Sequence, residues 1–144
     1  MTISPEQRIF VALDTTDLAR GLELARSLKG LVGGMKIGKE FYTALGPVGA
    51  RQILAEGMPV FLDLKFHDIP NTVAGAVRAA MPMAPTILDI HAAGGRAMME
   101  AARDAAAEEA ESLGVDRPLV LAVTVLTSLD ASDLADIGVG GEPV

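Results

Sequence analysis

Strand-like apolar runs alternate with helical patterns along the whole chain, and this alternation constrains the fold more than any other feature. The runs begin roughly every 25 to 32 residues, and we expect strands at 8–14, 34–37, 59–64, 86–91 and 118–125. Apolar spacing and capping signals between them predict helices after Asp17, after Gly46-Pro47, over 70–81 and over 96–113. Repeated alternation of strand and helix predicts a parallel sheet with right-handed crossovers.

Two α/β architectures accommodate five such units in 144 residues. Five units form a complete open sheet in proteins of the doubly wound, flavodoxin-like type. At about 29 residues per unit, they equally match the first five-eighths of an eight-stranded β/α barrel, which needs about 230 residues. The periodicity is compatible with both architectures.

Composition excludes several classes of protein. The chain is 50% hydrophobic and 22% charged, which rules out disorder and indicates a single globular domain. A formal net charge of −7 argues against a nucleic-acid partner. The sequence contains no apolar run long enough to span a membrane, so we expect no membrane partner. It also contains no cysteine, which fits a reducing compartment, and we expect a cytoplasmic protein.

Polar residues gather where the predicted strands end. They are Asp14, Lys36, Asp63, Lys65, Asp68, Asp89, His91, Thr127 and Ser128. In both architectures the functional site lies at the carboxyl ends of the strands. Charges placed there cost several kcal/mol per ion unless partners compensate them. Opposite signs at neighbouring strand ends supply such partners, so we expect these residues to form a site.

Asp63 and Lys65 are the most informative pair. Residues two apart on a strand share a face, so both side chains point to the same side of the sheet. Asp68 or Lys36 could complete an alternating Lys–Asp–Lys–Asp array, which keeps both lysines protonated. A protonated lysine stabilises a carbanion and then donates its proton to it, while the neighbouring carboxylate repels a substrate carboxylate. This pattern predicts a decarboxylation that needs no metal and no other cofactor.

Simpler interpretations exist for the same residues. A single strand-end charge such as Asp14 can be an ordinary solvated residue, and Asp63 and Lys65 can form a purely structural ion pair. We interpret His67 as support for the loop geometry and His91 as a packing residue beside Asp89. Charges at four strand ends together favour the functional interpretation.

The block at 63–72 (DLKFHDIPNT) resembles the signature of the orotidine 5′-phosphate decarboxylase family in its bacterial form. Supporting segments follow in the family's order: VALD at 11–14, KIGKEFY at 36–42, DIHAAGG at 89–95 and AVTVLTS at 122–128. The resemblance implies a (β/α)8 TIM barrel that works as a homodimer. It implies the decarboxylation of orotidine 5′-monophosphate to UMP and CO2 in de novo pyrimidine synthesis. We then expect residues 1–144 to be a single domain, a partial barrel of about five β/α units without the strand 6–8 region.

The resemblance also implies a role for each residue at the reacting end of the substrate. Asp63 would stress the substrate carboxylate, and Lys65 would donate the proton to C6. Asp14 and Lys36 would bind the ribose hydroxyls, with Lys36 also a member of the charge array.

Further residues are implied at the edges of the site. Asp68, Ile69 and Thr72 would reach into the site of the partner subunit, and Thr127 would contact the pyrimidine ring. In the family, strands six to eight carry the loop over the base and the arginine that grips the phosphate. We expect these elements to lie outside the present sequence.

Three other functions are compatible with parts of the pattern. One is a truncated, inactive fragment that retains only an interaction role. Another is a related barrel, a hexulose-phosphate synthase or keto-gulonate-phosphate decarboxylase, which holds Mg2+ with a similar Asp-x-Lys-x-x-Asp pattern. The third is a phospho-receiver domain, which needs an acidic pair after strand one and a lysine after strand five. The chain has Asp14 with Thr15-Thr16, and Thr127-Ser128, at those places.

Overall fold

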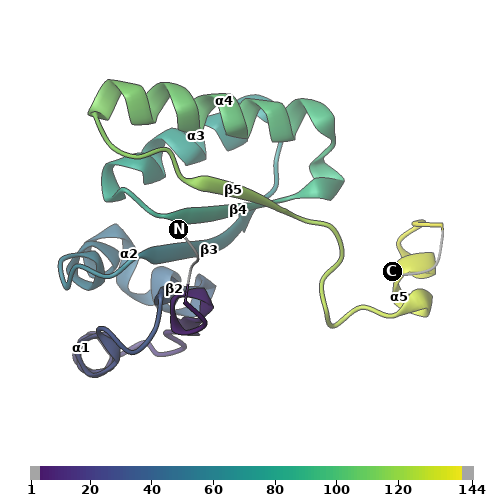
Figure 1. Ribbon diagram of the computed structural model, residues 1–144. Helices are drawn as coiled ribbons and strands as arrows, with labels where there is room; N and C mark the ends of the chain where they lie inside the picture. Colours follow the sequence, from purple (N-terminus) through teal and green to yellow (C-terminus); the bar gives the residue numbers. More distant parts are fainter. Residues whose placement is uncertain (1–3, 141–144) are drawn as a thin grey trace.

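The computed structural model describes residues 4–140 as alternating strands and helices (Figure 1). The strands are β1 (Phe10–Ala12), β2 (Gly34–Ile37), β3 (Val60–Phe66), β4 (Ile87–His91) and β5 (Leu119–Val123). The helices are α1 (Leu18–Leu28), α2 (Lys39–Leu54), α3 (Pro70–Ala80), α4 (Arg96–Leu113) and α5 (Ala131–Asp136). Three 3-10 helices complete the order: η1 (Glu6–Arg8), η2 (Met81–Met83) and η3 (Ala92–Gly94).

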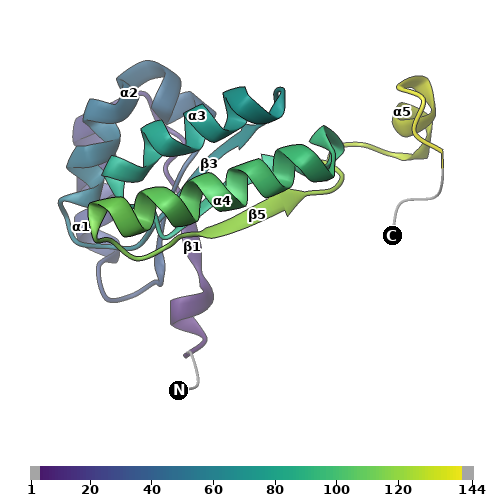
Figure 2. The same ribbon diagram turned by 90° about the horizontal axis from the view of Figure 1, so that it is seen from above.

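The five strands are parallel and lie side by side in chain order, β1-β2-β3-β4-β5. A doubly wound sheet reverses its strand order at a switch point, whereas a barrel adds each new strand on the same side as the last. Right-handed crossovers then place the connecting helices on one face of the sheet. Figures 1 and 2 show α3 and α4 lying side by side, and the two helices pack against each other. The sequential strand order therefore identifies the barrel architecture rather than the doubly wound sheet.

The two faces of the sheet differ in burial. Residues paired across parallel strands share a face, and successive residues alternate between faces. On the helix-covered face, Met35 pairs with Val60, and these side chains are 0% and 1% exposed. On the opposite face, Leu119 and Leu121 of β5 are 62% and 43% exposed. The core thus lies between sheet and helices, and the face that becomes the interior of a barrel is open.

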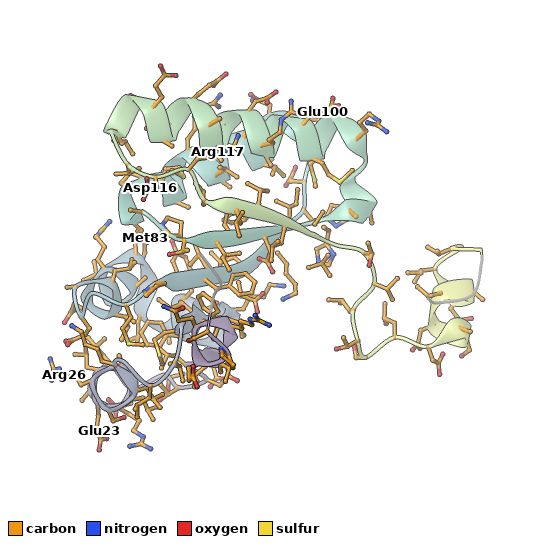
Figure 3. The ribbon with its side chains drawn as sticks, viewed as in Figure 1. Glu23, Arg26, Met83, Glu100, Asp116 and Arg117 are labelled. Carbon is orange, nitrogen blue, oxygen red and sulfur yellow. The ribbon has the colours of Figure 1, made fainter. Side chains whose placement is uncertain are left out.

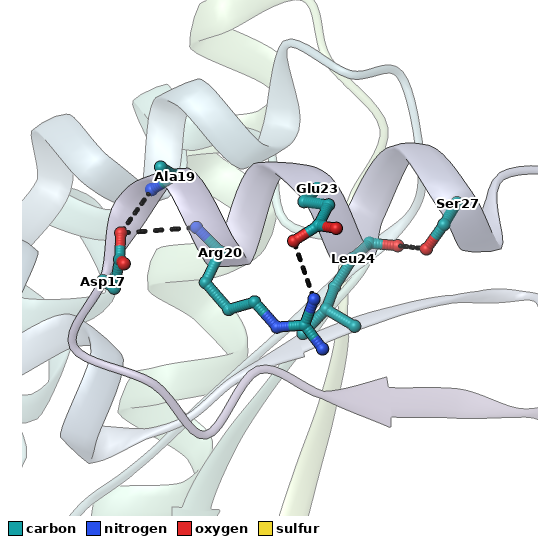
Figure 4. A network of polar contacts seen from close by, with 6 residues as sticks. All are labelled: Asp17, Ala19, Arg20, Glu23, Leu24 and Ser27. Carbon is teal, nitrogen blue, oxygen red and sulfur yellow. Dashed lines mark hydrogen bonds and ion pairs between the residues drawn. The ribbon is translucent and has the colours of Figure 1, made fainter.

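Helix α1 begins where the sequence predicts. The Asp17 Oδ1 atom accepts the backbone N–H groups of Ala19 at 2.8 Å and Arg20 at 3.3 Å (Figure 4). Such a cap satisfies N–H groups that have no partner inside the helix. Glu23 and Arg26 lie on the outer side of the same helix (Figure 3). The apolar side of α1, with Gly21 and Ala25 buried, is therefore the one that packs.

Helix α2 begins earlier than the sequence pattern predicts. Gly46-Pro47 predicts a helix start, but α2 is already helical from Lys39 and is kinked at Gly46, where φ is 59° and ψ is −165°. Glycine adopts this left-handed φ readily, and proline suits the first turn of the second segment because no N–H is needed there. The pair thus marks a kink within a longer helix. As a result, α2 starts directly after β2, beside the strand end that carries Lys36.

The segment after β5 leaves the sheet. Figure 1 shows α5 apart from the other helices, near the end of the described chain. Asp130 and Asp133 form a reciprocal capping box at its start, which satisfies backbone N–H groups at the N-terminus of this short helix. None of the helices between residues 4 and 140 combines the length and the apolar character needed to cross a bilayer.

Candidate active site

Charged side chains from β2, β3 and β4 converge at the carboxyl ends of these strands. The Nζ atom of Lys36 lies 2.9 Å from Oδ2 of Asp63. The Nζ atom of Lys65 donates to Oδ1 of Asp63 and lies 3.5 Å from Oδ2 of Asp89. We call these four residues the strand-end cluster; its positive and negative groups alternate. The sequence predicts the Asp63 and Lys65 pair with Lys36 as its extension, and the structure brings these three together.

Asp63 is the centre of the cluster and is held ionised. Asp63 is 9% exposed, and burial alone would favour the neutral form of its carboxyl group. The hydrogen bonds from Lys65 and Lys36 outweigh burial and lower the pKa of Asp63 to about 2. Burial likewise opposes the charge of Lys65, but Asp63 and Asp89 raise the pKa of that lysine above its ordinary value. Lys65 therefore remains a proton donor throughout the neutral range.

Asp89 is the member of the cluster that the sequence places at a strand end without indicating a specific role. It is 1% exposed, and its Oδ1 atom accepts the backbone N–H of Lys65 at 2.8 Å. Burial, together with the hydrogen bond to Asp63, raises the pKa of Asp89 to about 6. The signal that could have revealed its role is an acidic residue inside the apolar run at 86–91.

Asp14 lies at the edge of the cluster. It follows β1 and is exposed, and Gly38 is the capping residue before α2. A Cβ atom added at Gly38 would lie 3.4 Å from Lys36 Nζ and 3.8 Å from Asp14 Oδ1. Glycine therefore leaves room for both polar groups, which border the same small space.

The turn between β3 and α3, together with the first turn of α3, carries the three residues of the predicted partner contact. Asp68, Ile69 and Thr72 are all exposed, Ile69 by 67%. The Asp68 Oδ1 atom accepts the N–H of Ile69 at 2.7 Å. Within residues 4–140, no ion pair joins Asp68 to Lys36 or Lys65, so Lys36 and Asp89 flank the central pair instead. The predicted contribution of these three residues to a partner's site remains a prediction.

Two histidines and one threonine lie around this site. The rings of His67 and His91 are tilted by 37° with their centroids 5.3 Å apart, so the two side chains pack against each other. His91 lies two residues after Asp89 on β4. Thr127 lies in the exposed turn between β5 and α5. The described structure does not bring Thr127 to the cluster, and its predicted contact with a substrate ring stays a prediction.

The donor set of the cluster suits an anionic reaction better than a metal ion. In the described part of the chain, no three His, Asp or Glu side chains converge as metal ligands would. Asp63 instead directs its two oxygens at ammonium groups. An ammonium donor held between carboxylates stabilises negative charge that develops beside it, and Asp63 repels any second carboxylate placed there. Loss of CO2 followed by protonation of the resulting carbanion is the chemistry that this arrangement favours.

A family model matches residues 7–142, nearly the whole chain. It is described as the orotidine 5′-phosphate decarboxylase / HUMPS family. The chain belongs to this family. The resemblance seen in the sequence is thereby confirmed at the level of the family.

Curated relatives match over almost the full length of this chain but only part of their own. The orotidine 5′-phosphate decarboxylase of Rhodospirillum rubrum is 55% identical over 142 residues, which cover 98% of this chain and 56% of the relative. That of Paramagnetospirillum magneticum is 52% identical and is matched over 90% of this chain and 55% of the relative. The chain therefore spans little more than half the length of the relatives it matches.

Solved structures share the fold. The orotidine 5′-phosphate decarboxylase of Lactobacillus acidophilus superposes with a TM-score of 0.76 at 32% identity, covering 90% of this chain and 58% of that one. An uncharacterized conserved protein of Geobacillus kaustophilus gives a TM-score of 0.83 at 38% identity, covering 92% and 62%. The predicted TIM-barrel fold class, with this chain as about the first five β/α units, is confirmed.

Proposed function

We propose that the protein decarboxylates orotidine 5′-monophosphate to UMP and CO2, a step of pyrimidine biosynthesis. The observation that carries the proposal is the ammonium group of Lys65, held on Asp63 with Lys36 on the other side of the same carboxylate. The names of the curated relatives support the same reaction. The reaction requires no cofactor, and its expected location is the cytoplasm.

Each member of the central pair has a defined part in this reaction. The bond between C6 and the carboxylate carbon breaks, CO2 leaves, and the electron pair stays on C6. The Nζ atom of Lys65 then gives a proton to C6, which yields UMP, and the neutral amine regains its proton from solvent. Asp63 stands beside the substrate carboxylate and repels it, which favours its departure. Lys36 helps Asp63 to stay ionised for this purpose.

Substrate binding involves residues around the cluster. Asp14 and Lys36 bind the ribose hydroxyls, an assignment supported by the way both border the space at Gly38. Thr127 contacts the pyrimidine ring. Residues 1–144 act as one domain, and the phosphate is held by the part of the family fold that follows strand five.

The functional unit is a homodimer in which Asp68, Ile69 and Thr72 reach the partner's site. The high exposure of Ile69 supports this, because a large apolar side chain at the tip of a turn is suited to contact with another surface. The position of Asp68 supports it too, since its carboxylate lies outside the cluster of its own chain. A shallow groove lined by Asp68 and Ile69 with Ala93 and Gly94 runs beside this turn.

The test uses a protein of full family length. Residues 1–144 are continued with the corresponding C-terminal remainder of the Rhodospirillum rubrum relative, which we call the barrel-length fusion. With substrate labelled on its carboxylate, the fusion is expected to release labelled CO2 and to form UMP in equal amount. The remainder alone is the control and should release none. A folded fusion that releases no CO2 would contradict the proposal.

A magnesium-dependent sugar-phosphate reaction is the competing function, because the matched family also includes the HUMPS proteins. It makes a different demand on Asp63, which would have to bind the metal rather than two ammonium groups. Treating the fusion with EDTA separates the two functions. Decarboxylation of the nucleotide should be unchanged, whereas a loss of activity that Mg2+ restores would favour the competitor.

A further inference from the structure

The pairing of β3 with β4 is interrupted at the level of the cluster. Leu62 pairs with Leu88, and the next pair is Phe66 with Ile90. Residues 63–65 lie between these pairs on β3, whereas Asp89 alone lies between them on β4. The extra residues form a bulge in β3, and Asp63 and Lys65 belong to it. Asp89 is the residue that faces the bulge.

Lys65 adopts an unusual backbone conformation within this bulge. Its φ angle is 51°, in the left-handed region that residues other than glycine, asparagine and aspartate rarely occupy. A lysine stays in this region only when its surroundings hold it there. Bulges that redirect a side chain are common beside active sites. The conformation of Lys65 therefore needs a specific partner.

Asp89 is that partner, and it contacts Lys65 at both ends of the residue. Its Oδ1 atom accepts the backbone N–H of Lys65 at 2.8 Å, and its Oδ2 atom lies 3.5 Å from Nζ. Asp89 is 1% exposed, so water does not compete for these contacts. On the other side of Asp89, Leu121 of β5 is its pairing residue.

We propose that Asp89 is a positioning residue, which holds the backbone of Lys65 in the left-handed conformation and so fixes the ammonium group against Asp63. This inference rests on the proposed function, in which Lys65 is the proton donor. In this proposal the bulge, together with the contact of Asp89 with the Lys65 backbone, brings Asp63 and Lys65 to one face of the sheet. The regular alternation of a strand is not the cause. The titratable groups that surround Asp89 are Asp63 and Lys65 of β3, Lys36 of β2 beyond Asp63, and His91 of β4.

Two substitutions separate the two contacts of Asp89. Asp89→Asn keeps Oδ1 as the acceptor for the backbone N–H of Lys65 but replaces Oδ2 with an amide group that cannot accept from the ammonium. Asp89→Ala removes both contacts. The matched control is the pair Asp17→Asn and Asp17→Ala, since Asp17 also accepts backbone N–H groups but lies at the start of α1.

The measurements are kcat, KM and the pH profile of kcat in the barrel-length fusion. Asp89→Ala should lower kcat by about 100-fold, the effect of misplacing a reacting group by about 1 Å, with KM within about threefold. Asp89→Asn should lower kcat by about tenfold and move the alkaline limb of the profile to lower pH, because Lys65 loses a nearby negative charge. The Asp17 variants should leave kcat and the profile unchanged.

Hydrogen exchange at the Lys65 amide supplies a readout that is independent of activity. NMR of the 15N-lysine-labelled fusion should show exchange at least about tenfold faster in Asp89→Ala than in the wild type, and little changed in Asp89→Asn. A folded Asp89→Ala variant with kcat within about threefold of wild type, or with unchanged exchange, would overturn the proposal. If Asp89→Ala does not fold, an unmoved alkaline limb in Asp89→Asn overturns it. If the wild-type fusion is inactive, the proposed function fails, and exchange alone decides the role of Asp89.

Discussion

At the scale of single residues, the buried carboxylates of the cluster behave in opposite ways. Asp63 has two ammonium partners, which hold its pKa near 2 despite burial. Asp89 is more deeply buried and lies next to the charge of Asp63, so its pKa is raised to about 6. The sequence predicts the first of these environments, because Lys36 and Lys65 stand at matching strand ends. It does not reveal the second, because nothing in the local pattern shows that residues 63–65 bulge opposite Asp89.

The raised pKa of Asp89 makes stability depend on pH. A carboxyl group whose pKa is higher in the folded state stabilises the fold fully below its unfolded pKa of 3.8 and loses that contribution as pH rises through about 6. Asp89→Asn has no such dependence. Between pH 4 and pH 7, the unfolding free energy of the wild-type fusion should therefore fall relative to Asp89→Asn by on the order of 2 to 3 kcal/mol. Urea titrations at both pH values measure it, and a constant difference would contradict this origin of the shift.

At the scale of elements, the periodicity of the sequence predicts the five strands and the helices α1 to α4, but neither α5 nor the irregular positions. The strands at 34–37 and 86–91 and the helix ending before Gly114 are found close to the predicted bounds. The early start of α2 and the bulge in β3 are not, and the bulge involves contacts of Lys65 with Asp89 on another strand, which no local signal shows. The start of α2 follows Lys36 closely, and the bulge contains Lys65, so both irregularities lie at the site.

The cap of α1 offers a test of stability that is separate from the chemistry. Asp17→Ala removes the acceptor for two backbone N–H groups and should lower the unfolding free energy of the fusion by about 1 kcal/mol. Asp17→Asn retains an acceptor and should lower it by less. Denaturant titration measures both variants, and kcat should be unchanged in each. An Asp17→Ala variant as stable as wild type would show that the cap contributes nothing measurable.

At the scale of the whole molecule, the order of the strands carries the information that the sequence pattern lacks. Five alternating units fit an open sheet as well as part of a barrel, and only the sequential order β1 to β5 distinguishes them. The open face with exposed Leu119 and Leu121 is the surface that the interior of a complete barrel would bury. The sequence also does not predict the position of Thr127, because the segment that carries this residue leaves the sheet after β5 (Figure 1).

Sharing of sites between subunits can be measured by mixing inactive variants. The Lys65→Ala and Asp68→Ala fusions are each expected to be inactive. If Asp68 acts in the partner's site, a mixed dimer has one site with both residues intact, and random reassembly of equal amounts should restore up to about a quarter of wild-type activity. The unmixed variants are the controls. Activity no greater than the sum of theirs would mean that Asp68 does not act across the interface.

The role of Lys65 as proton donor is tested by the turnover of orotidine 5′-monophosphate by the barrel-length fusion with Lys65→Ala. The proton donor and one partner of Asp63 are then missing, so kcat should fall by about 1000-fold or more. Lys29→Ala is the matched control, because Lys29 is exposed and lies outside the cluster; it should keep wild-type kcat. A folded Lys65→Ala fusion that decarboxylates the nucleotide within about tenfold of the wild-type rate would contradict the central role of Lys65.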